Sequence, residues 1–255
     1  MKAGWLSAAG VCVVGIGTVV DGVDAQTVTV DLIPTRSNTL FEDPLGQTSG
    51  GAAPWIFAGL TLQPQLRRGL LAFDVTAIPA GSTVTAVALT LHLSRTSTGN
   101  EPATLHTMLA DWGSAGSLPP EPGGFGAPAE AGDATWLYSF YDGNGGGQEW
   151  GTPGGDFDAD ALATTVVGGV GFYTWSSGAM AADVQRWLDE GPGGNFGWML
   201  RGNEDVPQSA KRYDTQWHED PRFWPRLTVT YTIPGPGAAG IVAGGALLWG
   251  RRRRS

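Results

Sequence analysis

The sequence predicts an all-β protein, a single jelly-roll-like antiparallel β-sandwich with one short helix. Its 255 residues include 40 glycines and 17 prolines, a composition that favours many turns and few long helices. Hydrophobic residues alternate with polar ones in many short segments, which is the period of a strand with one buried face. Helical spacing of hydrophobic residues occurs convincingly in one segment, around residues 180–188.

The clearest strand signal lies in Leu66–Leu93. Two alternating runs in this segment each place hydrophobic residues on one face: Leu71, Phe73 and Val75 in the first, and Val87, Leu89, Leu91 and Leu93 in the second. Between them Ile78–Ser82 contains a proline and a glycine, which favour turns. We expect the two strands to pair antiparallel and to pack one hydrophobic face into the core.

Several further segments have the alternation of strands. The first is Thr27–Ile33 and the last is Leu227–Ile233, as expected if both ends belong to one closed sandwich. The others are 40–44, 55–60, 103–108, 134–141, 166–167, 171–175, 196–200 and 211–213. Asp111–Asp133 is rich in glycine, proline and serine, and we expect it to be a surface loop that buries little. Asp142–Trp150 is expected to be a second open loop.

One helix is predicted. Its hydrophobic residues recur at i, i+4, i+7 and i+8 and form one stripe: Met180, Val184, Trp187 and Leu188. Ser176 or Ser177 can cap the start of this helix. Gly191 followed by proline can end it.

Residues 1–25 have the features of a secretory signal peptide. A lysine at the second position precedes the apolar run Leu6–Val20, and Val23–Ala25 offers small residues at a cleavage point. The competing interpretation is a lipoprotein signal that uses Cys12, and the valine before this cysteine disfavours it. Cys12 is the single cysteine, so the cleaved chain would carry no disulfide and no thiol chemistry.

Residues 234–255 contain a Pro/Gly hinge, the apolar run Ala238–Trp249 and the basic cluster Arg251–Arg254. The run is shorter than the roughly 20 residues that span a bilayer, and the terminal arginines fit the positive-inside rule. In this order the parts resemble the PEP-CTERM class of sorting signals, with Pro-Gly-Pro where Pro-Glu-Pro is usual. The resemblance implies an exosortase-type sorting peptidase, a bacterial envelope of the Gram-negative type, and a destination at the cell surface or in the extracellular matrix. The alternative is a weak permanent membrane anchor, and we expect membrane association through the termini to be transient.

The formal net charge is −9, and Arg251–Arg254 supplies four of the 15 basic residues. The domain without this tail is therefore more acidic still. An acidic domain repels phosphate backbones, which argues against a nucleic-acid partner. The same charge disfavours strongly anionic polysaccharides unless a cation or a local basic patch intervenes.

Four groups of motifs occur in order along residues 26–233. They are Arg68–Val75 with Ile78–Ser82, Asp133–Tyr138 with Trp150–Asp156, Asp183–Leu188 with Asn195–Leu200, and Lys211–Thr215 with Pro225–Tyr231. Together they resemble the DNRLRE domain family, which is similar to a class of carbohydrate-binding modules. The chain departs from this family at Gln216-Trp217, where an Arg-Glu pair is common. The resemblance implies a secreted jelly-roll-like sandwich that is often fused to enzymes and is usually non-catalytic.

Three carboxylates at alternate positions, Asp156, Asp158 and Asp160, are spaced as in the first half of a calcium-binding loop. Ala161 and Val167 stand where an EF-hand has its turn glycine and its bidentate glutamate, so this is not an EF-hand. A structural calcium ion in an irregular loop is one hypothesis, and a loop without metal is the other.

Aromatic residues beside loops are the candidate carbohydrate-binding residues. Trp112, Trp150 and Trp217 lie in or next to predicted loops, where an exposed indole ring can stack on a sugar while Arg212 donates hydrogen bonds to hydroxyl groups. Tyr141 is a further candidate. Trp150 and Trp217 fit a core position equally well. Three other tryptophans lie in regular apolar patterns and are expected in the core: Trp175, Trp187 and Trp198.

Catalytic motifs are absent from the sequence. His92, His106 and His218 lack the spacing of metal ligands, and no nucleophile elbow or phosphate-binding loop occurs. The sequence therefore predicts a secreted, surface-sorted, non-catalytic module that binds a polysaccharide or surface glycan. The alternatives are a structural surface or matrix protein without a glycan ligand and, less favoured, a polysaccharide hydrolase or lyase.

Overall fold

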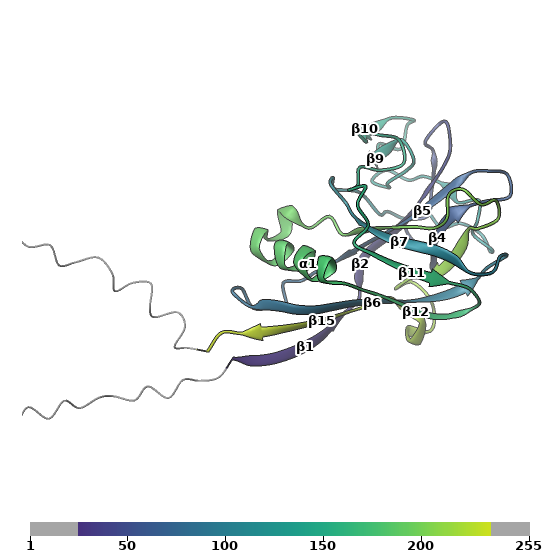
Figure 1. Cartoon of the computed structure of the whole chain (residues 1–255). Helices are drawn as coiled ribbons and strands as arrows, with labels where there is room; N and C mark the ends of the chain where they lie inside the picture. The colour runs from purple at the N-terminus through teal and green to yellow at the C-terminus, as the bar shows by residue number, and fades with distance from the viewer. Residues whose placement is uncertain (1–24, 236–255) are drawn as a thin grey trace, which may run out of the picture. The chain divides into compact units, whose positions relative to one another are not determined.

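Short alternating segments fold into antiparallel strands throughout residues 25–235, the part of the chain that this computed structural model describes (Figure 1). Every strand pair in that part is antiparallel. Residues Gln26–Ile233 form one compact unit. The predicted signal peptide and sorting segment lie outside the described residues. The all-β prediction is confirmed.

The elements include 15 strands, one α-helix and two 3-10 turns within residues 25–235. They are β1 (Gln26–Leu32), β2 (Pro34–Phe41), β3 (Thr48–Ser49), β4 (Trp55–Leu60), β5 (Leu66–Phe73), β6 (Thr83–Arg95), β7 (Glu101–Thr107), β8 (Ala127–Pro128), β9 (Tyr138–Tyr141), β10 (Gly147–Glu149), β11 (Ala163–Val167), β12 (Gly171–Ser176), α1 (Gly178–Glu190), η1 (Pro192–Gly194), β13 (Trp198–Arg201), β14 (Lys211–Asp214), η2 (Pro221–Phe223) and β15 (Arg226–Ile233).

One 11-stranded sheet curls to form both layers of the sandwich (Figure 1). One layer contains β1, β15, β6, β12 and β14, and the other contains β2, β5, β13, β7 and β11. Strand β4 belongs to both layers, because Trp55–Ala58 pairs with β14 and Gly59–Leu60 pairs with β5. Gly59 has a φ of 120° at this change of partner, and a Cβ there would lie 2.8 Å from the Cα of Ala210. The corner of the sandwich therefore requires glycine.

The two ends of the compact unit leave from the same end of the sandwich, because Gln26 lies opposite Ile233 in the β1–β15 pair. Strand β6 starts at that end, where Thr83 lies opposite Thr232. It runs for 13 residues to Arg95, which is roughly 40 Å at about 3.3 Å per residue. Arg95 therefore marks the opposite end of the molecule.

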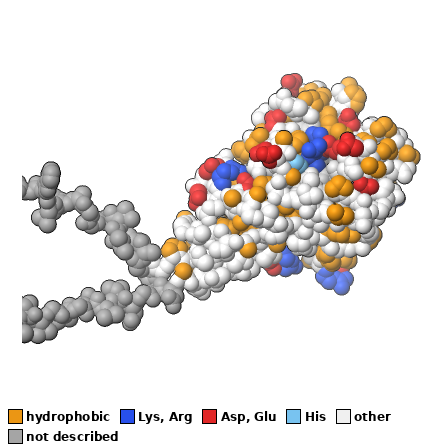
Figure 2. Space-filling model, in the orientation of Figure 1, with side chains coloured by type: hydrophobic (Ala, Val, Ile, Leu, Met, Phe, Trp, Pro, Cys, Tyr) orange, Lys and Arg blue, Asp and Glu red, His pale blue; other side chains and the backbone are white. Residues whose placement is uncertain are grey.

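The space between the layers is filled by the hydrophobic faces that the sequence predicts. Leu71 and Phe73 from β5 and Leu89 and Leu91 from β6 are at most 2% exposed. The three tryptophans predicted for the core are buried there as well: Trp175, Trp187 and Trp198. On the face shown in Figure 2, acidic and basic side chains lie close together in several places, and hydrophobic side chains are scattered among them.

Helix α1 packs its predicted stripe, including Met180, Val184 and Trp187, against this core. Ser177 Oγ accepts a hydrogen bond from the Met180 amide at 3.0 Å and so caps the first turn. Gly191, with a φ of 73°, donates its amide to the Trp187 carbonyl at 3.0 Å and ends the helix. The helix prediction is confirmed at both ends.

The expected pairing of the two strands in Leu66–Leu93 is wrong. Strand β5 pairs with β2, β4 and β13, whereas β6 pairs with β12, β14 and β15. After β5, the Ile78 amide donates to the Val75 carbonyl at 2.9 Å, and both of these side chains are buried in the core. The link therefore crosses the end of the sandwich, and the two strands face each other from opposite layers.

The expectation that Asp111–Asp133 buries little is also wrong. Trp112 is fully buried, and Ala127–Pro128 pairs as β8 with β3. The cause is that β5 has hydrophobic residues on both faces. Leu70 and Ala72 point away from the sandwich interior, and Trp112 helps to bury them in a second hydrophobic cluster.

Candidate functional site

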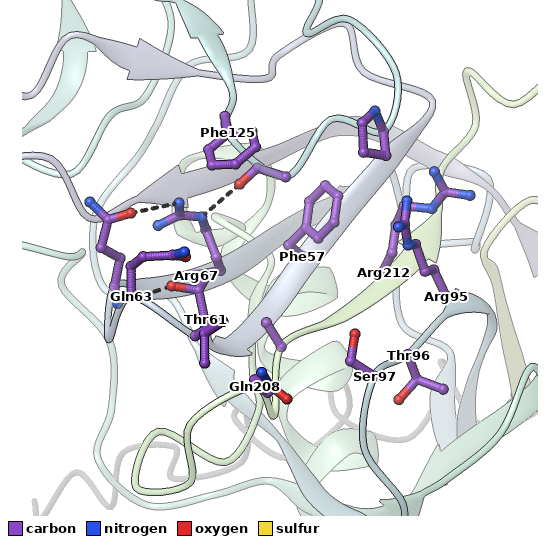
Figure 3. A pocket seen from close by; sticks show the side chains of 15 residues that line it. Phe57, Thr61, Gln63, Arg67, Arg95, Thr96, Ser97, Phe125, Gln208 and Arg212 are labelled. Atoms are coloured by element: carbon purple, nitrogen blue, oxygen red, sulfur yellow. Dashed lines mark hydrogen bonds between the residues drawn. The ribbon is translucent and has the colours of Figure 1, made fainter.

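A groove of about 370 Å³ opens at the end of the sandwich where β6 ends and β14 begins (Figure 3). Its walls come from the β4–β5 turn, the turn after β6, the start of β14 and the loop 122–125. Three arginines line it, namely Arg67, Arg95 and Arg212. None of the described residues that line it is acidic. We call it the arginine groove.

Arg67 is the most deeply placed of the three arginines, at 3% exposure. Its guanidinium donates to the Leu66 carbonyl at 2.8 Å, to the Gly124 carbonyl at 3.3 Å and to Gln65 Oε1 at 3.4 Å. It also stacks over the ring of Phe41 at 4.9 Å. These contacts fix the orientation of the side chain.

The charge of Arg67 is not neutralised by an ion pair. Burial lowers the pKa of its guanidinium to about 10, against an opposing effect of the nearby Glu42, so Arg67 stays protonated at neutral pH. Within residues 25–235 no carboxylate oxygen lies within the 4.0 Å of a salt bridge to it. A buried cation without a carboxylate in salt-bridge contact is costly, and an anionic ligand would offset that cost.

The other two arginines are also weakly neutralised. Arg212 stacks over the ring of Trp55 at 4.7 Å. Its Nη1 lies 3.4 Å from Glu121 Oε2, but that glutamate side chain is 68% exposed, so the pair is weak. Arg95 is exposed and makes no ion pair in the described part of the chain.

Hydrophobic surface accompanies these cations. Phe125 is 80% exposed and Leu62 is 59% exposed, whereas Phe57 is largely buried. In Figure 3, Arg67 is drawn on one side of Phe57 and Arg212 on the other. An exposed ring beside hydrogen-bond donors is the combination that holds the apolar face and the polar edge of a sugar.

Three exposed amide side chains also line the groove, those of Gln63, Gln65 and Gln208. Gln208 has a φ of 65°, and no other non-glycine residue between 25 and 235 has a positive φ. Backbone strain of this kind costs on the order of 1 kcal/mol or more and concentrates at functional sites. This strained residue lies in the wall of the groove.

Lys211 holds the wall formed by the turn after β6. Its side chain is buried at 2% exposure, and its Nζ donates to Thr96 Oγ1 at 2.8 Å and to the Gly99 carbonyl at 2.9 Å. Burial lowers the pKa of this ammonium, and the charge of Glu101 opposes that effect. Because Thr96 lines the groove, Lys211 fixes the shape of the groove from behind.

Of the residues predicted to bind carbohydrate, Arg212 lines the groove and the others do not. Trp112, Trp150 and Tyr141 are only 0%, 5% and 7% exposed, so none of them offers an exposed ring to a sugar, and of the two positions open to Trp150 the core position is the one found. The indole N–H groups of the two tryptophans donate to backbone carbonyls at 2.7 Å and 2.9 Å. Both tryptophans belong to the second hydrophobic cluster, where they cover the outer face of β5.

Trp217 is exposed, at 55%, but it does not line the arginine groove. Its neighbour Gln216 is half-buried, and both polar atoms of that side chain are buried without a hydrogen-bond partner. Trp217 and Trp150 are therefore not two parts of one exposed platform.

Two of the three carboxylates proposed for calcium, those of Asp156 and Asp158, accept hydrogen bonds from nearby backbone amides. Asp156 accepts the Gly151 and Thr152 amides at 2.8 Å and 2.9 Å, and Asp158 accepts the Asp160 amide at 3.0 Å. No cluster of three or more potential metal ligands occurs among residues 25–235. A calcium ion held by Asp156, Asp158 and Asp160 stays a prediction.

A His–Asp pair lies outside the groove. His92 Nδ1 is 2.6 Å from Asp214 Oδ2, and the rings of Phe223 and Phe172 lie 4.2 Å and 4.8 Å from the imidazole. No serine, threonine or cysteine of the described chain hydrogen-bonds to the second ring nitrogen of His92. The pair thus lacks the nucleophile that a catalytic triad requires.

Sequence reasoning missed Arg67, Arg95 and Phe125. For Phe125 the composition gave no usable signal, because Phe125 and Trp112 lie in the same Gly/Pro-rich segment and one is 80% exposed while the other is fully buried. For the arginines there was none, because their proximity depends on the turns that bring β4, β5, β6 and β14 together.

No protein-family model matches the chain, and no curated protein matches it either. The resemblance to the DNRLRE domain family stays a prediction. None of the helical segments in residues 25–235 has the length and apolar character needed to cross a membrane.

Proposed function

We propose that this chain is a secreted, non-catalytic saccharide-binding module whose arginine groove takes a negatively charged saccharide. The observation that carries the proposal is the set of three guanidinium groups in a groove without acidic lining. Guanidinium groups bind carboxylate and sulfate groups through parallel hydrogen bonds. The adjoining Phe125 and the glutamine side chains supply the stacking surface and the neutral hydrogen bonds that a sugar ring uses.

The overall charge of −9 is compatible with this ligand because the groove is a local basic patch. Arg67 is buried, and charges at buried positions are screened less by salt than exposed ones. The rest of the acidic surface would then repel polyanions that approach elsewhere, which favours binding at this end of the sandwich.

The position of the groove also supports display at a cell surface. Gln26 and Ile233 leave from one end of the sandwich, and Arg95 marks the other end, roughly 40 Å away by strand length. A module attached through its C-terminal segment, after processing by a sorting peptidase or through a membrane anchor, would carry the groove at the end of the sandwich opposite Ile233. We propose this arrangement together with the signal peptide and the sorting signal.

Affinity electrophoresis tests the proposal. The full chain should migrate more slowly in gels that contain polygalacturonate or hyaluronan, but not in gels that contain dextran, and added salt should reduce the retardation. Arg67→Met should weaken binding about tenfold to hundredfold, the value of one or two hydrogen bonds to a charged group. Arg222→Met is the matched control, because Arg222 is 83% exposed and pairs with Asp220 outside the groove.

Two outcomes would overturn the proposal. The first is equal migration in all three gels, which would favour a structural surface protein without a glycan ligand. The second is retardation that Arg67→Met and Arg222→Met leave equally intact, which would place binding elsewhere. Release of new reducing ends or of unsaturated sugars during incubation would favour a polysaccharide hydrolase or lyase.

A further inference from the structure

A second hollow of about 200 Å³ adjoins the arginine groove. The two share three lining residues, namely Gln65, Arg67 and Phe125. The remaining walls of the second hollow include Glu42 and Thr48. Two hollows that share a boundary of three side chains can be occupied by neighbouring units of one chain-like ligand.

The shared boundary is built from residues that suit a sugar chain. Arg67 donates hydrogen bonds to Gln65 Oε1 at 3.4 Å and to the carbonyl of Gly124, the residue before Phe125, at 3.3 Å. Phe125 projects at 80% exposure between two glycines. One of them, Gly126, has a φ of 73°, and a Cβ there would lie 2.4 Å from Thr48. The turn that carries the phenylalanine is therefore restricted to this path beside the second hollow.

The two hollows differ in charge. The arginine groove has three guanidinium groups and, among its described lining residues, no carboxylate. The second hollow has the carboxylates of Glu42 and Asp43 and shares a single cation, Arg67. Glu42 Oε2 accepts the Leu66 amide at 2.6 Å, which holds this carboxylate in place.

Asp43 stays ionised at neutral pH. Burial alone would raise the pKa of its carboxyl, but hydrogen bonds from the Gln47 and Leu45 amides and from Thr48 outweigh that effect and keep the pKa below its ordinary value. A negative group placed in the second hollow would therefore meet like charge in a partly buried setting, where repulsion is weakly screened.

We infer that the arginine groove and the second hollow form one track for a saccharide chain whose negative charge lies on the unit in the arginine groove and whose next unit is uncharged. This inference rests on the proposed function and names the ligand class: an acidic heteropolysaccharide in which charged and uncharged sugars alternate, rather than a uniform polyuronate. The attractive arginines and the repulsive Glu42 and Asp43 act together, as specificity requires.

Titration calorimetry with two oligosaccharides of equal length tests this inference on the full chain. Hyaluronan tetrasaccharide alternates a uronate with an uncharged N-acetylhexosamine, whereas tetragalacturonate carries a carboxylate on every unit. We expect the hyaluronan fragment to bind at least tenfold more tightly. Lengthening the ligand from glucuronate alone to the hyaluronan disaccharide, which adds the unit for the second hollow, should also raise the affinity, a measurement that needs no variant.

Glu42→Gln sharpens the test. The amide oxygen of glutamine can still accept the Leu66 amide, but the negative charge is gone. We expect the affinity for tetragalacturonate to rise severalfold while that for the hyaluronan fragment changes less than twofold. Glu149→Gln is the matched control, because Glu149 is an exposed glutamate on β10 that lines neither hollow.

The two levels of the proposal fail differently. The track is overturned if the two tetrasaccharides bind with equal affinity, if Arg67→Met abolishes both affinities and if Glu42→Gln changes neither. The proposed function still stands in that case. Absence of binding by any of these acidic saccharides would overturn the proposed function, and the track with it.

Discussion

Arg67 and Arg68 are neighbours on β5, yet they have opposite surroundings. Arg68 donates to both oxygens of Glu204 at 2.8 Å and 3.1 Å. Its guanidinium carbon lies 5.0 Å and 5.2 Å from the ring centroids of Trp136 and Phe157. Arg67 has no carboxylate partner within salt-bridge distance among residues 25–235. Strand alternation alone separates them, because successive side chains point to opposite faces.

The difference shows which charges are available to a ligand. Glu204 is shared by Arg68 and Arg201, so both guanidinium groups on that face have an ion-pair partner inside the protein. Acidic and basic groups lie close together on the face shown in Figure 2 as well. Two buried cations, Arg67 and Lys211, make no ion pair in the described part of the chain. The ammonium of Lys211 donates to Thr96 and Gly99 behind the groove wall, whereas Arg67 lines the arginine groove itself.

The largest expected change in stability is at Arg68, the arginine that pairs with Glu204. Arg68→Met removes the donors to Glu204 and leaves that carboxylate, which is 14% exposed, with Arg201 as its remaining partner. Breaking a buried pair in this way should lower the free energy of unfolding by about 3 kcal/mol. Urea denaturation measures the loss. Arg222→Met, whose ion pair is exposed, should leave the urea midpoint unchanged, and equal midpoints for the two variants would refute a structural role for Arg68.

A smaller effect is expected from acid. Burial alone would raise the pKa of Glu204, but hydrogen bonds from Arg68 and Arg201 outweigh it and lower the pKa from 4.5 to about 2. The folded state thus binds this proton less readily than the unfolded state. The resulting stabilisation is present above about pH 4.5 and is lost as the pH falls toward 2.

Melting curves between pH 7 and pH 2 test whether the stabilisation by Glu204 is lost as the pH falls. Glu204→Gln cannot titrate, so its melting temperature should be lower than that of the original chain at pH 7, and the gap should narrow as the pH falls below 4.5. A gap that stays constant over the whole range would show that Glu204 does not supply the acid-sensitive stability.

The sequence was informative about strands and the helix because these depend on local periodicity. The alternation in β6 and the stripe of α1 identify buried residues such as Leu89 and Trp187 without any knowledge of the partner strands. Pairing was not predictable in the same way. The Asp74–Ser82 link reads as a hairpin turn, and its crossing of the sandwich end depends on the burial of Ile78 in the core.

The candidate site was harder still to predict. A tryptophan in a loop-like stretch suggests an exposed ring, but Trp112 and Trp150 fill the cluster over the outer face of β5. That face needs a cover because Leu70 and Ala72 point outward from the sandwich interior. The arginine groove joins residues that are far apart in the chain, and no local pattern distinguishes Arg67 from Arg68.

Of the charged groups with little exposure at Arg67, Arg68 and Glu204, Arg67 is expected to contribute least to stability. Arg67→Met loses three hydrogen bonds and one ring contact, but it also removes an unpaired buried charge, and replacing such a charge by an apolar side chain of similar length is often nearly neutral. We expect the free energy of unfolding to change by less than about 1 kcal/mol, while binding of acidic saccharide is largely lost. Urea denaturation and affinity electrophoresis on the same preparation measure the two quantities. If Arg67→Met is as unstable as Arg68→Met, Arg67 is a structural residue that stabilises the fold. The two neighbouring arginines would then differ in their contacts but not in their role.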